Sequence, residues 1–312
     1  MATPGTTSTA DLPPLRAWLP DYVILALIWG SSFMLVKVSV EEFTGVGSSF
    51  LRQVIGTITL LSFMLIGRHR FPPRALWGHI AVIALLMSVL PGTLISISQN
   101  YISSGLAAIL NSTVPLATLV VVLAAYRDEE VLTRARAFGL FIGFGGVLVV
   151  LGAWNGFGEV SWIGVALVLA SVVGPAIAFP YTRQHLSGKV EAIPLVATQI
   201  LFSAIIMIPW VLVTGVTHSA VTLGPVAALT TLGVISTGVA YTLNFRIITV
   251  AGATTLASVT YLLPVVAVVT GALVLGERLA WYQPVGGAVV LAGAAISQGR
   301  LRLVRRPSSA TA

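Results

Sequence analysis

The stretch Glu277-Arg278-Leu279 follows the apolar run 253–274 and repeats Glu130-Val131-Leu132, which follows the apolar run 105–125. In both copies, glycines stand nine and sixteen positions after the glutamate, and the two glutamates are 147 positions apart. Residues 105–146 and 252–293 therefore form an internal duplication. Because both copies are largely apolar, the duplication predicts a repeated membrane unit, an architecture typical of transporters.

The composition indicates a surface that faces lipid. Hydrophobic residues make up 56% of the 312 residues and charged residues only 9%, whereas a soluble domain carries about 25% charge. Cysteine is absent, which excludes disulfides and thiolate metal sites. The net charge of +7 is spread over short loops, which argues against nucleic acid as a partner. We expect a lipid bilayer and a small-molecule substrate as partners, and no cofactor. Composition leaves the oligomeric state open.

Ten apolar segments approach the length of about 20 residues that a transmembrane helix needs. They span residues 22–40, 46–66, 76–97, 105–125, 137–152, 162–181, 193–214, 224–245, 253–274 and 283–299. The fifth and tenth are short and glycine-rich, which suits close helix packing. The first is too long for a cleaved signal peptide and should stay as an anchor. We therefore expect an all-α integral membrane protein with ten transmembrane helices in two inverted five-helix repeats, 19–153 and 154–299. A disordered tail (1–18) and a basic tail (300–312) flank them.

Lysine and arginine predict the orientation, because they concentrate on the cytoplasmic side. With the amino terminus inside, 14 of the 17 cations fall in inner loops and tails: Arg16, Arg68, Arg70, Arg74, Arg127, Arg134, Arg136, Arg183, Lys189, Arg246, Arg300, Arg302, Arg305 and Arg306. Both termini are thus expected in the cytoplasm of a bacterial plasma-membrane protein. Five helices per unit place the two copies in opposite senses, the arrangement on which alternating access relies.

The chain resembles the EamA-type members of the drug/metabolite transporter superfamily over about residues 20–300. The matching signals are Ile28-Trp29-Gly30-Ser31-Ser32-Phe33, Arg52, the stretch 104–110 with Pro115, Tyr261 with Pro264, and Leu275-Gly276-Glu277-Arg278-Leu279. The resemblance implies ten helices in two inverted halves, a central cavity, and movement of small metabolites, commonly by export. The first repeat departs from the pattern, because residues 127–132 lack the Gly-Glu-Arg-Leu signature. The matching prolines are also offset by 149 positions instead of 147.

Polar side chains inside spans are costly unless they face protein or water, which makes them candidate site residues. We expect substrate binding by Trp29, Ser31, Gln99, Asn111, Ser112, Tyr241, Asn244 and Tyr261. The aromatic members lie too deep to act as interfacial anchors, and their rings suit stacking on a solute. Each serine has a plainer interpretation, a hydrogen bond to its own helix. The two asparagines are equally well explained by bonds between helices.

A second set of residues is expected to serve gating or structure: Arg52, Pro91, Pro115, Pro175 and Pro264. The prolines break helical hydrogen bonds and act either as static kinks or as pivots. Arg52 lies inside the second span, where a charge needs a partner. Pairing with backbone carbonyls, Glu41 or Glu42 is favoured over binding an anionic substrate. Glu130 and Glu277 are expected to cap or tether loop ends, and Lys37 to reach the outer surface.

The distribution of acids bears on mechanism. All ten Asp and Glu residues lie in tails, loops or helix ends, whereas coupled pumps usually carry protons on a buried carboxylate. Facilitated diffusion or exchange is therefore favoured, and coupling through Glu41, Glu42 or His79 stays open. We expect a transporter that exports a small metabolite, an amino acid or related compound, or a drug-like amphiphile, by alternating access. The alternatives are an intramembrane enzyme acting on lipid and a channel. The sequence shows neither a clustered catalytic or metal-binding set nor a filter motif.

Overall fold

A computed structural model describes residues 15–125, 134–152, 161–186, 188–244, 246–247, 250 and 259–297. Over these residues the chain is helical, and the β-type pairing there is an isolated bridge between Phe43 and Thr217. Residues 1–14 of the expected amino-terminal tail, the expected basic tail, Glu130 and the boundary between the two expected repeats lie outside the described residues, whereas residues 15–17 of the first tail form a 3-10 turn.

Seven helical segments of the described chain are long and apolar enough to cross a membrane. After a short 3-10 turn, η2 (Leu15–Ala17), three of them are continuous helices: α1 (Leu19–Ser39), α2 (Gly45–Ile66) and α10 (Ala192–Thr214). The other four change geometry within the span. They are η3-α3-η4-α4 (Arg74–Leu76, Trp77–Ala84, Leu85–Val89, Leu90–Ser98), α5-α6 (Ser104–Asn111, Val114–Ala125), α8-α9 (Trp162–Ser171, Val173–His185) and α11-η6 (Leu223–Thr231, Leu232–Val239).

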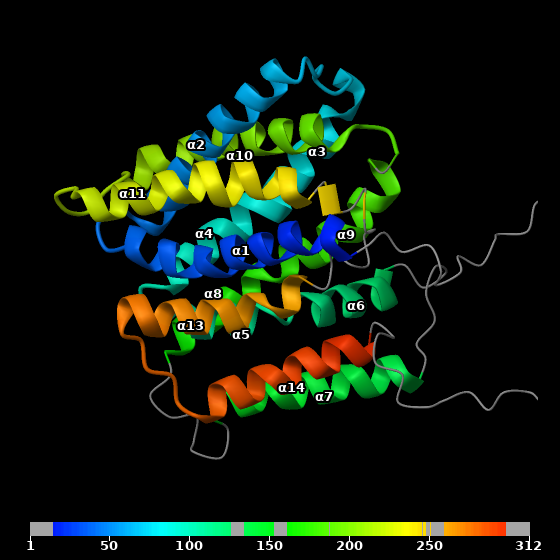
Figure 1. Cartoon of the computed structure of the whole chain (residues 1–312), viewed down its shortest axis with the longest axis vertical. Coiled ribbons are helices and arrows are strands. Elements are labelled where there is room, and N and C mark those ends of the chain that lie inside the picture. Colours follow the sequence, from blue (N-terminus) through cyan, green and yellow to red (C-terminus); the bar gives the residue numbers. More distant parts are fainter. Residues whose placement is uncertain are drawn as a thin grey trace, which may run out of the picture.

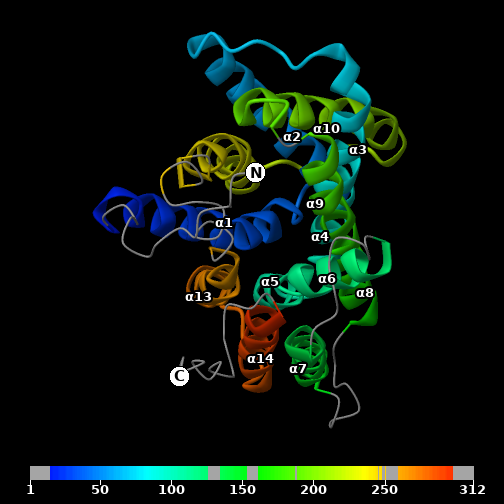
Figure 2. The ribbon, with the colours of Figure 1, turned by 90° about the vertical axis from the view of Figure 1, so that its right-hand side faces the viewer.

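Three shorter apolar helices complete the described part: α7 (Arg134–Val150), α13 (Leu263–Leu275) after the 3-10 turn η7 (Val259–Tyr261), and α14 (Tyr282–Ser297). Helices α7 and α14 lie side by side at one edge of the molecule, and α2 and α10 lie at the opposite edge (Figures 1 and 2). Helix α1 runs between these two edges.

The predicted close packing of the glycine-rich helices is confirmed. A Cβ atom at Gly146, Gly286 or Gly293 would lie 2.4–2.6 Å from a main-chain nitrogen of the facing helix. Because real Cβ contacts are longer, only glycine lets α7 and α14 approach so closely. The largest apolar cluster lies beside this pair and joins α5, α8 and α13 to it.

The prolines expected to break helices share one position. Pro91, Pro115, Pro175 and Pro264 each lie among the first three residues of a helical segment: α4, α6, α9 and α13. A missing N–H there removes no hydrogen bond from the new segment. Helices α6 and α13 begin 149 positions apart, so the offset of the two prolines is carried into the helices.

Candidate functional site

The eighth span contains a π-helical segment, η6 (Leu232–Val239), in which the Ala240 N–H donates to the carbonyl of Ile235. Such segments are rare and are frequent at functional sites, because they leave carbonyls open to other donors. The hydroxyl of Thr237 donates to one such carbonyl, that of Leu232, at 3.0 Å. Side chains of α1 and α2 reach this segment.

Helix α2 is pressed against η6 through glycines. A Cβ atom at Gly233 would lie 2.4 Å from Cβ of Ile55, and one at Gly238 would lie 2.3 Å from Cγ2 of Thr59. The sequence reasoning did not single out these two glycines. The available signal was the run Gly233-Val234-Ile235-Ser236-Thr237-Gly238, which places polar residues between glycines inside an apolar span.

Arg52 of α2 reaches the segment from this close contact. Its Nε donates to Oγ1 of Thr237 at 3.4 Å, its side chain is half-buried, and it interacts electrostatically with Tyr241. The expected pairing with Glu42 is wrong, because that carboxylate accepts hydrogen bonds from Thr222 N at 2.7 Å and Oγ1 at 2.6 Å. Among the described residues, the ion pairs do not include Arg52. Its charge therefore faces hydroxyl and aromatic groups in place of an acid.

Trp29 of α1 contacts the same segment from another side. Its Nε1 donates to the carbonyl of Ser236 at 3.2 Å, and its ring meets that of Tyr241 edge-on, with centroids 6.1 Å apart. Both aromatic side chains are half-buried. The hydroxyl of Ser236 is buried and makes no hydrogen bond among the described atoms. We refer to Trp29, Arg52, Ser236, Thr237 and Tyr241 as the π-segment site.

Gln99, another predicted binding residue, lies at the far end of the third span. Its side chain is fully buried, and neither amide atom has a partner among the described residues. Its main-chain carbonyl accepts from Nζ of Lys37, which also donates to the carbonyl of Ile102 at 3.2 Å. Lys37, expected to reach the outer surface, caps the end of α4, which the expected topology places on the outer side.

The remaining predicted residues are dispersed. The hydroxyl of Ser112 donates to Ile109 O at 2.6 Å, so the plainer interpretation, a bond within its own helix, accounts for its contact. Tyr261 packs against the large cluster beside α7 and α14, whereas Trp29 packs with a separate cluster. Three further residues are half-buried on their helices: Ser31, Asn111 and Asn244.

The predicted capping by Glu277 is confirmed, and its partner is the start of α5. The carboxylate accepts from Ser104 N at 2.7 Å, Ser104 Oγ at 2.8 Å and Gly105 N at 3.2 Å. A carboxylate at a helix amino terminus satisfies free N–H groups and interacts favourably with the positive end of the helix dipole. Gly271 leaves room for this contact, since a Cβ there would lie 2.4 Å from Oε2 of Glu277.

Comparison with known sequences identifies a family. The model of the EamA-like transporter family matches residues 21–152 and again residues 162–298. YvbV of Bacillus subtilis (strain 168), an uncharacterized transporter, is 27% identical over 274 residues, which cover 86% of this chain and 87% of YvbV. An uncharacterized transporter of Archaeoglobus fulgidus is 25% identical over 280 residues, covering 86% and 92% of the two chains.

The match to YedA of Escherichia coli (strain K12), described as an uncharacterized inner membrane transporter, is shorter. It is 27% identical over 150 residues, so the match spans about half of that relative, 47% of each chain. A solved crystal structure aligns with a TM-score of 0.63 at 18% identity, covering 92% of this chain and 98% of the other. At that identity, the likeness concerns the fold alone.

Proposed function

The chain belongs to the EamA-like transporter family and is a multi-pass membrane transporter, and we propose that it exports an amino acid or a related carboxylate by alternating access. The observation that carries the choice of substrate is the π-segment site. There the half-buried Arg52 donates to the Thr237 hydroxyl, the rings of Trp29 and Tyr241 meet on the same segment, and the ion pairs of the described residues do not include Arg52. An arginine in this setting favours a carboxylate, and aromatic faces favour an apolar or planar side chain.

We propose that ten helices cross the membrane as two inverted repeats. With the ten apolar segments numbered along the chain, the second packs on the seventh (α2 on α10) and the fifth on the tenth (α7 on α14). Each of these pairs maps onto itself when the two halves are exchanged. The first packs on the ninth (α1 on α13) and the fourth on the sixth (α6 on α9), and these two pairs map onto each other. This exchange pattern supports two equivalent halves around a shared centre.

The mechanism follows from the bonds at η6. Leu232 and Ser236 offer carbonyls that accept from side chains, Thr237 and Trp29. A substrate carboxylate competes with Thr237 for Arg52, since charge-assisted hydrogen bonds are stronger than neutral ones. When Arg52 releases Thr237, the packing of η6 on α2 loosens. The transport cycle is completed when the opposite end of the transporter closes. Hydrogen bonds made by side chains can change partners while the regular helix on either side of η6 stays intact.

The proposed topology has both termini in the cytoplasm of a bacterial cell. Lysine and arginine concentrate in the loops that this orientation places inside. Asp and Glu stand in tails, loops or helix ends of the sequence, so the substrate gradient itself is the proposed driving force. The direction, export, rests on the family resemblance.

The test is counterflow with purified full-length protein in liposomes. Vesicles are preloaded in turn with unlabelled amino acids, sugars or amphiphilic cations, and uptake of the matching labelled solute is followed without an ion gradient. We expect transient accumulation of amino acids, and its loss in Arg52→Gln. Arg183→Gln is the matched control, because it removes one exposed positive charge elsewhere. Accumulation of cations but not amino acids would overturn the proposed substrate. No accumulation of any solute, even with an imposed pH gradient, would overturn the carrier mechanism.

A further inference from the structure

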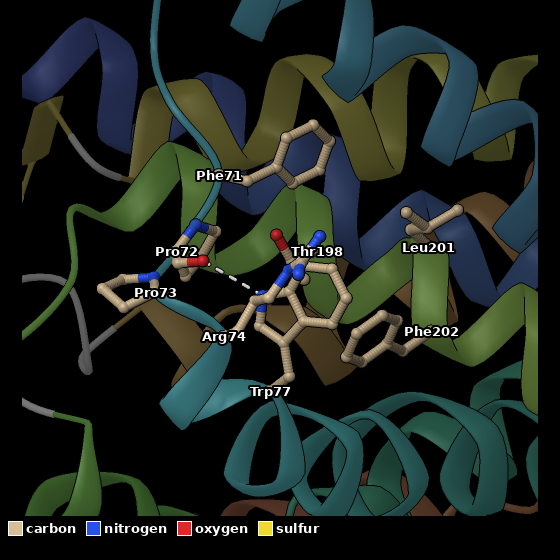
Figure 3. A pocket seen from close by; sticks show the side chains of 8 residues that line it. All are labelled: Phe71, Pro72, Pro73, Arg74, Trp77, Thr198, Leu201 and Phe202. Carbon is tan, nitrogen blue, oxygen red and sulfur yellow. Dashed lines mark hydrogen bonds between the residues drawn. The ribbon is translucent and has the colours of Figure 1, made fainter.

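A pocket lies away from the π-segment site, at the point where the loop after α2 leads into α3. Its volume is about 550 Å³, and it is formed by residues 71–74, Trp77 of α3, and Thr198, Leu201 and Phe202 of α10 (Figure 3). It thus joins the start of the third span to the seventh span. Nothing in the transport mechanism uses it.

The walls of this pocket are apolar and held in place. The Trp77 indole donates from Nε1 to the carbonyl of Pro72 at 3.0 Å, the dashed line in Figure 3. Its ring meets Phe202 edge-on, with centroids 5.6 Å apart. The Thr198 hydroxyl donates within α10, to Pro194 O at 2.8 Å. The pocket therefore offers aromatic and aliphatic surface, and the Trp77 indole and the Thr198 hydroxyl are already hydrogen-bonded.

The mouth of the pocket is positively charged. The Arg74 guanidinium carbon lies 5.9 Å from the Trp77 ring centroid, and the Arg74 side chain is exposed. Arg70, in the same loop, is exposed as well. The acid at the start of α10, Glu191, lies 3.0 Å from Nδ1 of His69, and the ion pairs of the described residues do not include Arg74.

The surrounding surface indicates that a membrane covers this pocket. Leu65 and Ile66, in the last turn of α2, are about four-fifths exposed, and Phe71 is about half exposed. Large apolar side chains at the end of a spanning helix face hydrocarbon, while tryptophan and arginine are typical of the headgroup level. An apolar pocket that opens toward lipid beneath a cationic rim matches the two parts of a phospholipid.

We propose that this pocket binds a phospholipid with an anionic headgroup, its acyl chain against Trp77 and Phe202 and its headgroup at Arg74. In the proposed topology, this end lies in the cytoplasmic leaflet. The site depends on the chain crossing a membrane and not on which solute is carried. Its failure and the failure of the proposed transport function are therefore distinguishable.

The test measures thermal unfolding of the full-length protein in neutral detergent micelles with added dioleoyl phosphatidylglycerol or dioleoyl phosphatidylcholine. We expect a saturable rise in the unfolding temperature with the anionic lipid and a smaller one with the neutral lipid. Arg74→Gln should weaken the apparent affinity for phosphatidylglycerol about fivefold, the contribution of one cation near a charged headgroup. Arg183→Gln, an exposed arginine of α9, should leave it unchanged.

A pocket-filling variant, Leu201→Trp, tests the acyl-chain site without changing the charge. It should lose the stabilisation specific to phosphatidylglycerol, measured against its own unfolding temperature without lipid. Equal stabilisation by both lipids would indicate unspecific annular lipid and overturn the proposal. The proposal would also fail if Arg74→Gln and Arg183→Gln behaved alike, or if glycerol phosphate alone reproduced the shift, which would indicate a free-phosphate site.

Discussion

The third and eighth spans each contain a π-helical segment, but the side chains that surround the two segments differ. Their π-helical segments, η4 and η6, begin at Leu85 and Leu232, 147 positions apart, the spacing of the internal duplication. In the third span, Pro91 follows the segment and offers no N–H to the preceding turn. No proline stands in the corresponding place of the eighth span.

The side chains that contact the two π-helical segments differ in burial. At η4, the Gln199 side chain of α10 donates to Ser88 Oγ at 2.9 Å, and Gly174 lies against the carbonyl of Leu86. The Ser203 hydroxyl of α10 shares its proton between Gln199 O at 2.8 Å and Ala84 O, just before η4, at 3.3 Å. Ser203 is fully buried. At η6, the half-buried Trp29 and Arg52 occupy the corresponding role. One segment is closed by buried groups and the other by half-buried aromatic and cationic groups that a solute can displace. We infer that the first serves structure and the second serves transport.

The sharpest test of this difference is Arg52→Gln at the eighth span. We expect counterflow to fall at least tenfold, because losing one partner of a desolvated charged contact costs about 2–5 kcal/mol. The measurement is initial uptake in liposomes, with protein per vesicle and the unfolding temperature compared with wild type. Arg52→Lys should recover part of the activity. Wild-type uptake in Arg52→Gln would end the assignment of η6 to transport.

A substitution that disturbs the contacts of the third span should lower the stability of the protein and leave transport unchanged. In Gly174→Ala, the added Cβ would lie 2.2 Å from Leu86 O, and overpacking of this kind costs about 1–3 kcal/mol. We expect a lower unfolding temperature, with normal uptake per folded molecule. Gly145→Ala is the control, because nothing lies within 4 Å of a Cβ there. Equal unfolding temperatures for the two variants would contradict the close contact.

A smaller effect is expected from Trp29→Phe, which keeps an aromatic ring and removes the donor to Ser236 O. One hydrogen bond contributes about 0.5–1.5 kcal/mol, so we expect roughly a fivefold change in the kinetic parameters for uptake. The ring contact with Tyr241 should persist. If Trp29→Phe matches wild type while Trp29→Ala is impaired, the ring and not its N–H serves the site.

The smallest effect is expected from Ser203→Ala, which removes one buried donor at η4. A loss of up to about 1 kcal/mol in the free energy of unfolding is expected, because the hydroxyl bonds mainly to Gln199 O within its own helix and only at 3.3 Å to Ala84 O. Uptake should be unchanged, as measured by counterflow at equal amounts of folded protein. Impaired uptake with unchanged stability would show that η4 takes part in transport too.

Much of the helical architecture could be predicted from the sequence. The apolar segments, the glycine contacts of α7 and α14, and the prolines at the start of new segments all depend on a few neighbouring residues. The capping role of Glu277 was also predictable, although the sequence could not identify its partner. The partner of Arg52 in the π-segment site was not predicted, because backbone carbonyls, Glu41 or Glu42 were expected where the structure places the Thr237 hydroxyl.

The sequence alone indicates which segments are apolar enough to enter a membrane, where a backbone must satisfy its hydrogen bonds within a helix. The side chains that meet at η6 and at α5 are known from the tertiary structure. The bonds from Trp29 to Ser236, from Arg52 to Thr237 and from Ser104 to Glu277 join residues 207, 185 and 173 positions apart. A helical sequence pattern reflects residues only a few turns apart. Hydrogen bonds between distant residues depend on how closely whole helices pack. The glycines that face other spans set this distance between helices.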